Sequence, residues 1–112
     1  MMNLKEALEL LEGTLLTPEC DLGLEFTRVF ASDLMSDVLA FMDAGTLLIT
    51  GLVNTHVVCT AGLAEAAAVV FVQGKRPSAQ VLDQARANKL PLLSTPLPMF
   101  EACARMGAGR PK

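Results

Sequence analysis

Near its middle the chain reads Thr46-Leu47-Leu48-Ile49-Thr50-Gly51-Leu52-Val53-Asn54, an apolar run that leads directly into a glycine and an asparagine. The apolar residues are continuous, which is typical of a strand that is covered on both faces. Residues 67–72 have the same character, and between the two runs Asn54 is placed to cap a helix over residues 55–64. The pattern predicts a parallel β-α-β unit.

The flanking segments extend this unit in both directions. At the amino terminus Asn3 and Glu6 form a capping-box pattern, followed by an amphipathic helix that Gly13 ends and by a strand over residues 14–17. The other predicted elements are a strand over residues 24–31, a helix capped by Ser32 or Asp33 and running through Met42, a helix capped by Ser78 and running to Asn88, a strand over residues 91–94, and a helix that starts near Thr95 and ends at Gly107.

Together these elements predict an α/β fold: a three-layer αβα sandwich with helices on both faces of a mostly parallel sheet of about five strands. A chain of 112 residues has room for one core, so we expect a single domain over residues 1–112. Residues 1–23 would hold an N-terminal helix and the first strand, and residues 107–112 would be a flexible tail.

Composition excludes several classes of protein. The chain is 52% hydrophobic and 19% charged, with a formal net charge of −3, five Phe and neither Trp nor Tyr. It therefore lacks both the basic surface and the stacking residues that nucleic-acid binding requires. The longest apolar run, residues 66–72, is far too short to span a bilayer. No secretory signal is written at the start, so we expect a cytoplasmic protein.

Nothing in the sequence indicates a cofactor, a metal site or a complete catalytic set. The three cysteines show no Cys-x-x-Cys spacing, and both nucleotide-binding glycine motifs are absent. His56 is the single histidine, and it is expected to play a hydrogen-bonding or surface role. Asp33 and Asp37 would lie one turn apart on a helix, as would Ser32 and Ser36, and two carboxylates so placed are more often solvated or capping than catalytic. We therefore expect no enzymatic activity.

Polar turns follow four predicted strands, and the carboxyl ends of parallel strands meet at one edge of a sheet. Helix N-termini and two cations at that edge would favour a small anionic ligand. The alternative is that the polar residues, among them Ser78, only cap helices. The candidate binding residues at this edge are Ser32, Asp33, Ser36, Thr50, Gly51, Asn54, Thr55, His56, Gly74, Lys75, Arg76, Ser94 and Thr95.

Four ordered blocks resemble the DRTGG domain family: ASDLMSDVLA (31–40), LITGL (48–52), VFVQGKRP (70–77) and LLSTP (92–96). The likeness spans residues 24–106. The family tends to have Thr-Gly-Gly where this chain has Thr27-Arg28-Val29, so only Thr27 is carried over as a candidate ligand-binding residue. The resemblance implies an α/β domain similar to the N-terminal domain of HPr kinase, found alone or beside CBS domains and often dimeric. Stand-alone members often accompany hydrogenase or other redox-enzyme genes.

The leading hypothesis is a non-catalytic, homodimeric regulatory module that senses a small anionic metabolite or a nucleotide and is accessory to a redox enzyme or to a CBS-type regulatory partner. The alternative is a protein-interaction subunit with no small-molecule ligand. Both hypotheses explain why a small chain carries a surplus of apolar side chains. The residues expected to form the dimer interface are Met35, Phe41, Met42, Phe100 and Met106.

Overall fold

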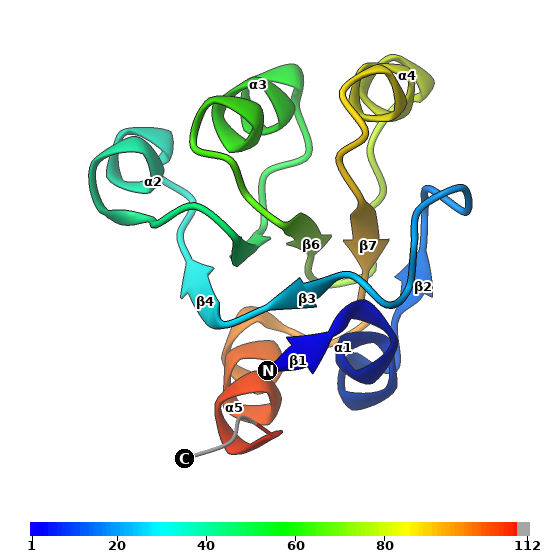
Figure 1. Cartoon of the computed structure of the whole chain (residues 1–112), viewed down its shortest axis with the longest axis vertical. Helices are drawn as coiled ribbons and strands as arrows, with labels where there is room; N and C mark the ends of the chain where they lie inside the picture. Colours follow the sequence, from blue (N-terminus) through cyan, green and yellow to red (C-terminus); the bar gives the residue numbers. More distant parts are fainter. Residues whose placement is uncertain (110–112) are drawn as a thin grey trace.

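A computed structural model describes residues 1–109 and shows a five-stranded sheet between two layers of helices (Figure 1). The strand order is β2-β7-β6-β5-β4, and the antiparallel strand β2 lies at one edge. The strands are β2 (Thr14–Leu15), β4 (Arg28–Ala31), β5 (Thr46–Thr50), β6 (Ala68–Phe71) and β7 (Leu92–Ser94). The last four are parallel to one another. The predicted mostly parallel sheet is therefore confirmed.

Helices cover both faces of this sheet, as predicted for a three-layer sandwich. One face carries α2 (Met35–Phe41), α3 (Thr55–Leu63) and α4 (Ala79–Ala87), and the other carries α1 (Leu4–Leu11) and α5 (Met99–Gly109) (Figure 1). Within residues 1–109, no helix combines the length and the apolar composition needed to cross a membrane.

The central strands divide their side chains between the two helical layers. Along β5, Leu47 and Ile49 belong to the core beneath α1 and α5, whereas Leu48 belongs to the core beneath α2, α3 and α4. On β6, Val70 and Phe71 divide in the same way, and all of these residues are fully buried. Each such side chain contributes about 1.5–3 kcal/mol on burial, which explains why these strands read as continuous apolar runs.

The predicted helix starts are correct at three positions, where the side chain of Asn3, Asn54 or Ser78 accepts a hydrogen bond from the first turn. The predicted glycine stops are wrong. Glu12, and not Gly13, takes the left-handed conformation that ends α1, and α5 continues through Gly107 to Gly109. One glycine in a helix costs only about 1 kcal/mol, and packing of the last turns of α5 offsets it. Residues 107–109 are thus helical, and the rest of the predicted tail lies outside the described residues.

Two helix ends show why glycine was not needed. Glu65 after α3 and Lys89 after α4 have φ angles of 57° and 55°, and in both turns the next residue donates its amide to the helix five positions back (Ala66 to Ala61 at 2.9 Å, Leu90 to Ala85 at 2.9 Å). These are Schellman motifs in which a residue with a side chain occupies the usual glycine position.

The predicted strand over residues 24–31 is broken in two. β3 (Glu25–Phe26) leaves the main sheet and pairs antiparallel with β1 (Met2–Asn3), a strand that the sequence did not indicate. Phe26 is buried in the core beneath α1 and α5, and this burial draws β3 away from the line of β4 (Figure 1). The alternating pattern was correct for strand structure but could not show the change of sheet.

Candidate functional site

Three loops meet at the carboxyl edge of the sheet. Asp33 follows β4, Thr50 is the last residue of β5 and Gly51 follows it, and Lys75 lies in the loop after β6. Asp33 Oδ1 accepts hydrogen bonds from Thr50 Oγ1 (3.0 Å) and from the Gly51 amide (2.7 Å). Lys75 Nζ donates to the Gly51 carbonyl oxygen at 3.0 Å. We call these four residues the strand-end cluster, in which a carboxylate and an ammonium group bind the two peptide groups of one glycine.

The local backbone explains how Lys75 reaches this position. Gln73 and Gly74 have φ angles of 60° and 67°, so two successive left-handed residues reverse the chain after β6. The turn is fixed by a hydrogen bond from the Gly74 amide to the Thr95 carbonyl (2.8 Å) and by one from Ser94 Oγ to the Lys75 carbonyl (3.1 Å). The loop after β6 is therefore tied to the end of β7 and presents Lys75 toward β5.

The space beside Gly51 separates the two charged groups. A Cβ atom at Gly51 would lie 3.4 Å from Asp33 Oδ2 and 3.5 Å from Lys75 Nζ, both ordinary van der Waals distances. Within residues 1–109, Asp33 Oδ2 accepts no hydrogen bond, and Lys75 Nζ uses one of its three N–H donors. The cluster therefore places an acceptor and a cation, both with unused hydrogen-bonding capacity, beside one glycine.

The capping role predicted for Ser32 or Asp33 is wrong. α2 begins at Met35 with Leu34 as an N-cap that makes no side-chain hydrogen bond, and Ser32 Oγ instead accepts from the Leu34 amide at 3.0 Å. Asp33 precedes the helix, so neither the predicted Asp33–Asp37 pair nor the Ser32–Ser36 pair shares a helical face. The Asp33 carboxylate instead accepts from two donors at the end of β5, the Thr50 hydroxyl and the Gly51 amide.

The other candidates lie in different surroundings. Asn54 caps α3 through the Val57 amide at 3.2 Å, as predicted, and His56 is exposed on the first turn of that helix. Thr95 is fully buried: its hydroxyl donates to the Leu11 carbonyl at 2.6 Å and neither caps α5 nor reaches the open edge. Thr95 therefore joins the end of β7 to α1.

The remaining candidates divide between the two edges of the sheet. Arg76 is exposed next to Lys75, and within residues 1–109 its side chain makes no hydrogen bond or ion pair; Thr55 is half-buried on α3 and Ser36 is exposed on α2. Thr27 precedes β4 and thus lies at the amino-terminal edge, separated from Asp33 by the whole length of β4, roughly 13 Å. The structure does not bring Thr27 to the strand-end cluster.

Among the cavities of residues 1–109, two lie away from this cluster. One, of about 480 Å³, is at the amino-terminal edge of the sheet beside Pro91, and the other, of about 130 Å³, lies beside β4 and Phe41. Sequence reasoning missed the larger cavity because its walls come from segments more than 60 residues apart. Within residues 1–109 no three His, Cys, Asp or Glu side chains gather as a metal site would require. Burial raises the pKa of the Cys103 thiol.

Comparison with known proteins identifies both the family and the fold. The model of the DRTGG domain family matches residues 6–108, which confirms the resemblance of the four sequence blocks. The fold is similar to that of the CBS and DRTGG domains of the regulatory region of Clostridium perfringens pyrophosphatase, solved in complex with its activator diadenosine tetraphosphate. The TM-score is 0.77 at 17% identity, over 93% of this chain and 45% of that one. A search of curated proteins found no match.

Proposed function

Because the chain belongs to the DRTGG domain family, we propose that it acts as a non-catalytic regulatory module that senses a small anionic metabolite, specifically a nucleotide, at the strand-end cluster. The observation that carries this proposal is that Asp33 Oδ2 and Lys75 Nζ both lie beside the same face of Gly51, within contact distance of the position that a Cβ atom would take. An acceptor next to a cation suits a molecule that carries both hydroxyl groups and phosphates.

Each part of a nucleotide has a partner in this arrangement. A ribose hydroxyl would donate to Asp33 Oδ2, which is free of hydrogen bonds within residues 1–109. A phosphate would accept from the two remaining donors of Lys75 and from Arg76, whose guanidinium suits bidentate binding of phosphate oxygens. Asp33 itself repels anions, so a ligand with phosphates alone would bind less well than one that also carries a sugar.

The related structure supports this choice of ligand class. The regulatory region of the clostridial pyrophosphatase was solved with a nucleotide activator, and this chain is similar in fold to 45% of that chain. A change of loop position on ligand binding would pass along the hydrogen bonds that join Lys75 to the end of β7. In this way the change caused by ligand binding would be transmitted to a neighbouring protein.

Calorimetric titration of the full chain with diadenosine tetraphosphate, ATP and ribose 5-phosphate tests the proposal. Gly51→Ala places a methyl group in contact with Asp33 and Lys75 without backbone strain, and Lys75→Met removes the cation; we expect each to weaken binding by about tenfold, equivalent to about 1.4 kcal/mol. The control is Lys5→Met, which removes another exposed lysine, on α1. Absence of binding by the wild-type chain, or equal loss in the control, would refute the proposal.

A second observation favours the homodimer and, with it, the alternative of a protein-interaction subunit. Phe41 of α2 is 70% exposed, and Leu34 and Leu39 on the same helix segment are more than half exposed, next to β4, which is an edge strand of the sheet. Of the other residues expected at the interface, Met42 and Met106 are buried in the core and so contribute none of the exposed apolar surface. We propose that α2 and β4 form the dimer contact. A redox-enzyme or CBS-type partner would use the same surface.

Light scattering after size exclusion measures this directly. We expect the wild-type chain to elute as a dimer and Phe41→Glu as a monomer, because a buried charge at the centre of the contact is strongly unfavourable. The matched variant is Phe100→Glu on α5. Phe100 was also expected at the interface from the sequence, but its phenyl ring is 81% exposed on the other side of the sheet and lies outside the contact proposed here. A wild-type monomer at 100 μM, or equal effects of the two variants, would exclude this interface.

A further inference from the structure

The larger cavity, of about 480 Å³, lies at the amino-terminal edge of the sheet, on the side opposite the strand-end cluster. Its apolar wall is formed by Leu24, Pro91 and Cys20, and its charged rim is formed by Glu19, Asp21, Arg86 and Lys89. We call it the amino-edge cavity. Its volume falls in the range of small-molecule sites.

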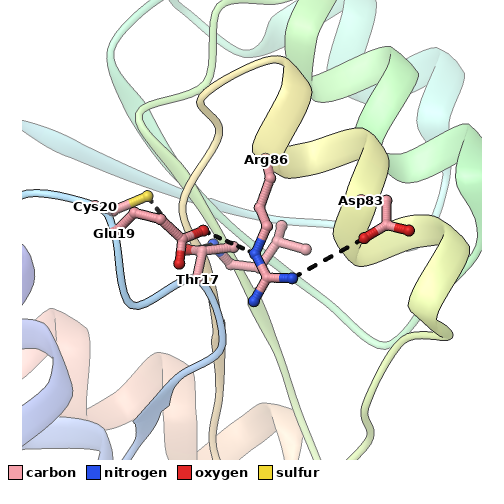
Figure 2. A network of polar contacts seen from close by, with 6 residues as sticks. Thr17, Glu19, Cys20, Asp83 and Arg86 are labelled. Atoms are coloured by element: carbon pink, nitrogen blue, oxygen red, sulfur yellow. Dashed lines mark hydrogen bonds and ion pairs between the residues drawn. The ribbon is translucent and has the colours of Figure 1, made fainter.

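One wall of this cavity is the loop after β2, and Thr17 bonds this loop to the first residue of β7. Thr17 is fully buried, and its hydroxyl oxygen accepts from the Leu92 amide at 3.1 Å and from Cys20 Sγ at 3.3 Å. Figure 2 shows Cys20 directed toward Thr17 at the base of this loop. Asp21 Oδ1 accepts from the Gly23 amide at 2.8 Å. The wall is therefore preformed and does not require ordering by a ligand.

The cation at the rim already holds a carboxylate. Arg86 Nε donates to Glu19 Oε1 at 2.7 Å, and a second guanidinium nitrogen lies 4.0 Å from Asp83 Oδ1 (Figure 2). Both members of the Arg86–Glu19 pair are about half exposed, and such pairs are weak enough to exchange. Lys89 lines the same rim, and within residues 1–109 its side chain has no hydrogen bond or ion pair. The rim thus has unused cationic donors, and its two carboxylates are Glu19, which is bound to Arg86, and Asp21.

We propose that the amino-edge cavity binds a small molecule with an apolar ring or chain and one carboxylate, which replaces Glu19 on Arg86 and also accepts from Lys89. The apolar part would rest on Leu24 and Pro91. The strand-end cluster does not take part, so a failure of binding at one of the two sites would not count against the other. A filled cavity would release the loop that carries Glu19 from its ion pair with α4.

Indole-3-acetate is a suitable probe because the chain contains no Trp and no Tyr, so indole fluorescence comes from the probe alone. We expect its fluorescence anisotropy to rise on binding to the full chain, with a Kd of about 1 mM or below for a ligand of this size. The neutral match, indole-3-acetamide, should bind at least fivefold more weakly. Equal affinity for the acid and the amide would overturn the proposal.

Variants of the ion pair give opposite expected effects. Arg86→Met should weaken binding of indole-3-acetate by about tenfold, whereas Glu19→Gln should strengthen it severalfold because the competing carboxylate is gone. The matched pair is Arg105 with Glu12, which lies 2.6 Å apart with a similar exposure of the arginine (42% against 43%). Arg105→Met and Glu12→Gln should leave the Kd unchanged. Weaker or unchanged binding by Glu19→Gln would refute the replacement of Glu19.

Cys20 provides a second readout that does not depend on affinity variants. In a Cys59→Ser, Cys103→Ala chain the single remaining thiol lines the cavity. Saturating indole-3-acetate should slow its alkylation by iodoacetamide at least threefold, and indole-3-acetamide at the same concentration should slow it less. An unchanged rate at saturation would place the probe elsewhere and overturn the assignment.

Discussion

Replacing Asp33 with alanine removes the hydrogen bonds that join the loop after β4 to the end of β5. The carboxylate accepts two bonds, at 3.0 Å from Thr50 Oγ1 and at 2.7 Å from the Gly51 amide. Hydrogen bonds to charged groups contribute about 1.5–3 kcal/mol when buried, and the exposure of Asp33 reduces this contribution. We expect Asp33→Ala to lower the free energy of unfolding by about 1–2 kcal/mol.

The conservative variant separates geometry from charge. Both bonds end on Oδ1, so Asp33→Asn keeps an acceptor in the same place, and we expect it to cost less than 1 kcal/mol. Asp43→Ala is the control, because it removes a carboxylate from an exposed ion pair with Arg28 and should change stability by no more than about 0.5 kcal/mol.

Chemical denaturation followed by circular dichroism gives these free energies, and a loss of 1 kcal/mol corresponds to about 4 °C in Tm for a chain of this length. A stability of Asp33→Ala within 0.5 kcal/mol of the wild type would show that Asp33 is a solvated side chain. An equal cost for Asp43→Ala would show that any surface carboxylate has this effect. Either result would refute the clustering of the strand-end loops through Asp33.

Three further predictions concern other parts of the fold. Glu65→Gly should raise the free energy of unfolding by about 1 kcal/mol, because glycine adopts the left-handed conformation there without strain. Urea denaturation measures this change, with Glu65→Ala as the comparison variant. Thr95→Val should cost about 2–3 kcal/mol, since it leaves the buried Leu11 carbonyl without its 2.6 Å donor; a shift of Tm below 4 °C would contradict this. Burial raises the pKa of Cys103, so its thiolate fraction at pH 8 is lowered and iodoacetamide should modify it more slowly than Cys59, as peptide mass spectrometry would show.

The sequence predicted the sheet and most of the helix starts because these depend on local patterns. Both faces of β5 and β6 are covered, so every residue along each strand is apolar or buried, and this continuous run is visible in the sequence itself. Asn54 and Ser78 bond to amides three positions away, so the sequence contains both partners. The two-residue strand β1 is too short to show any periodicity, and it was missed.

The candidate site was predicted less completely, and Asp33 shows why. An acidic residue shortly before an apolar stretch has the pattern of a helix cap, yet its partners here lie 17 and 18 positions along the chain. Thr95 has the same ambiguity, with a partner 84 positions away. The edge of the sheet at which the strands end could be predicted from topology. Whether a polar side chain there bonds to a nearby or a distant residue depends on how the loops fold over one another, which the sequence pattern does not show.

The most direct test of nucleotide sensing is an NMR titration of the 15N-labelled chain with diadenosine tetraphosphate. We predict that the amide signals of Gly51, Gly74 and Lys75 shift together and saturate with one affinity, while Glu19 and Lys89 at the opposite edge of the sheet keep their positions. Shifts confined to other surfaces, or none at millimolar nucleotide, would contradict the assignment of the strand-end cluster as the ligand site.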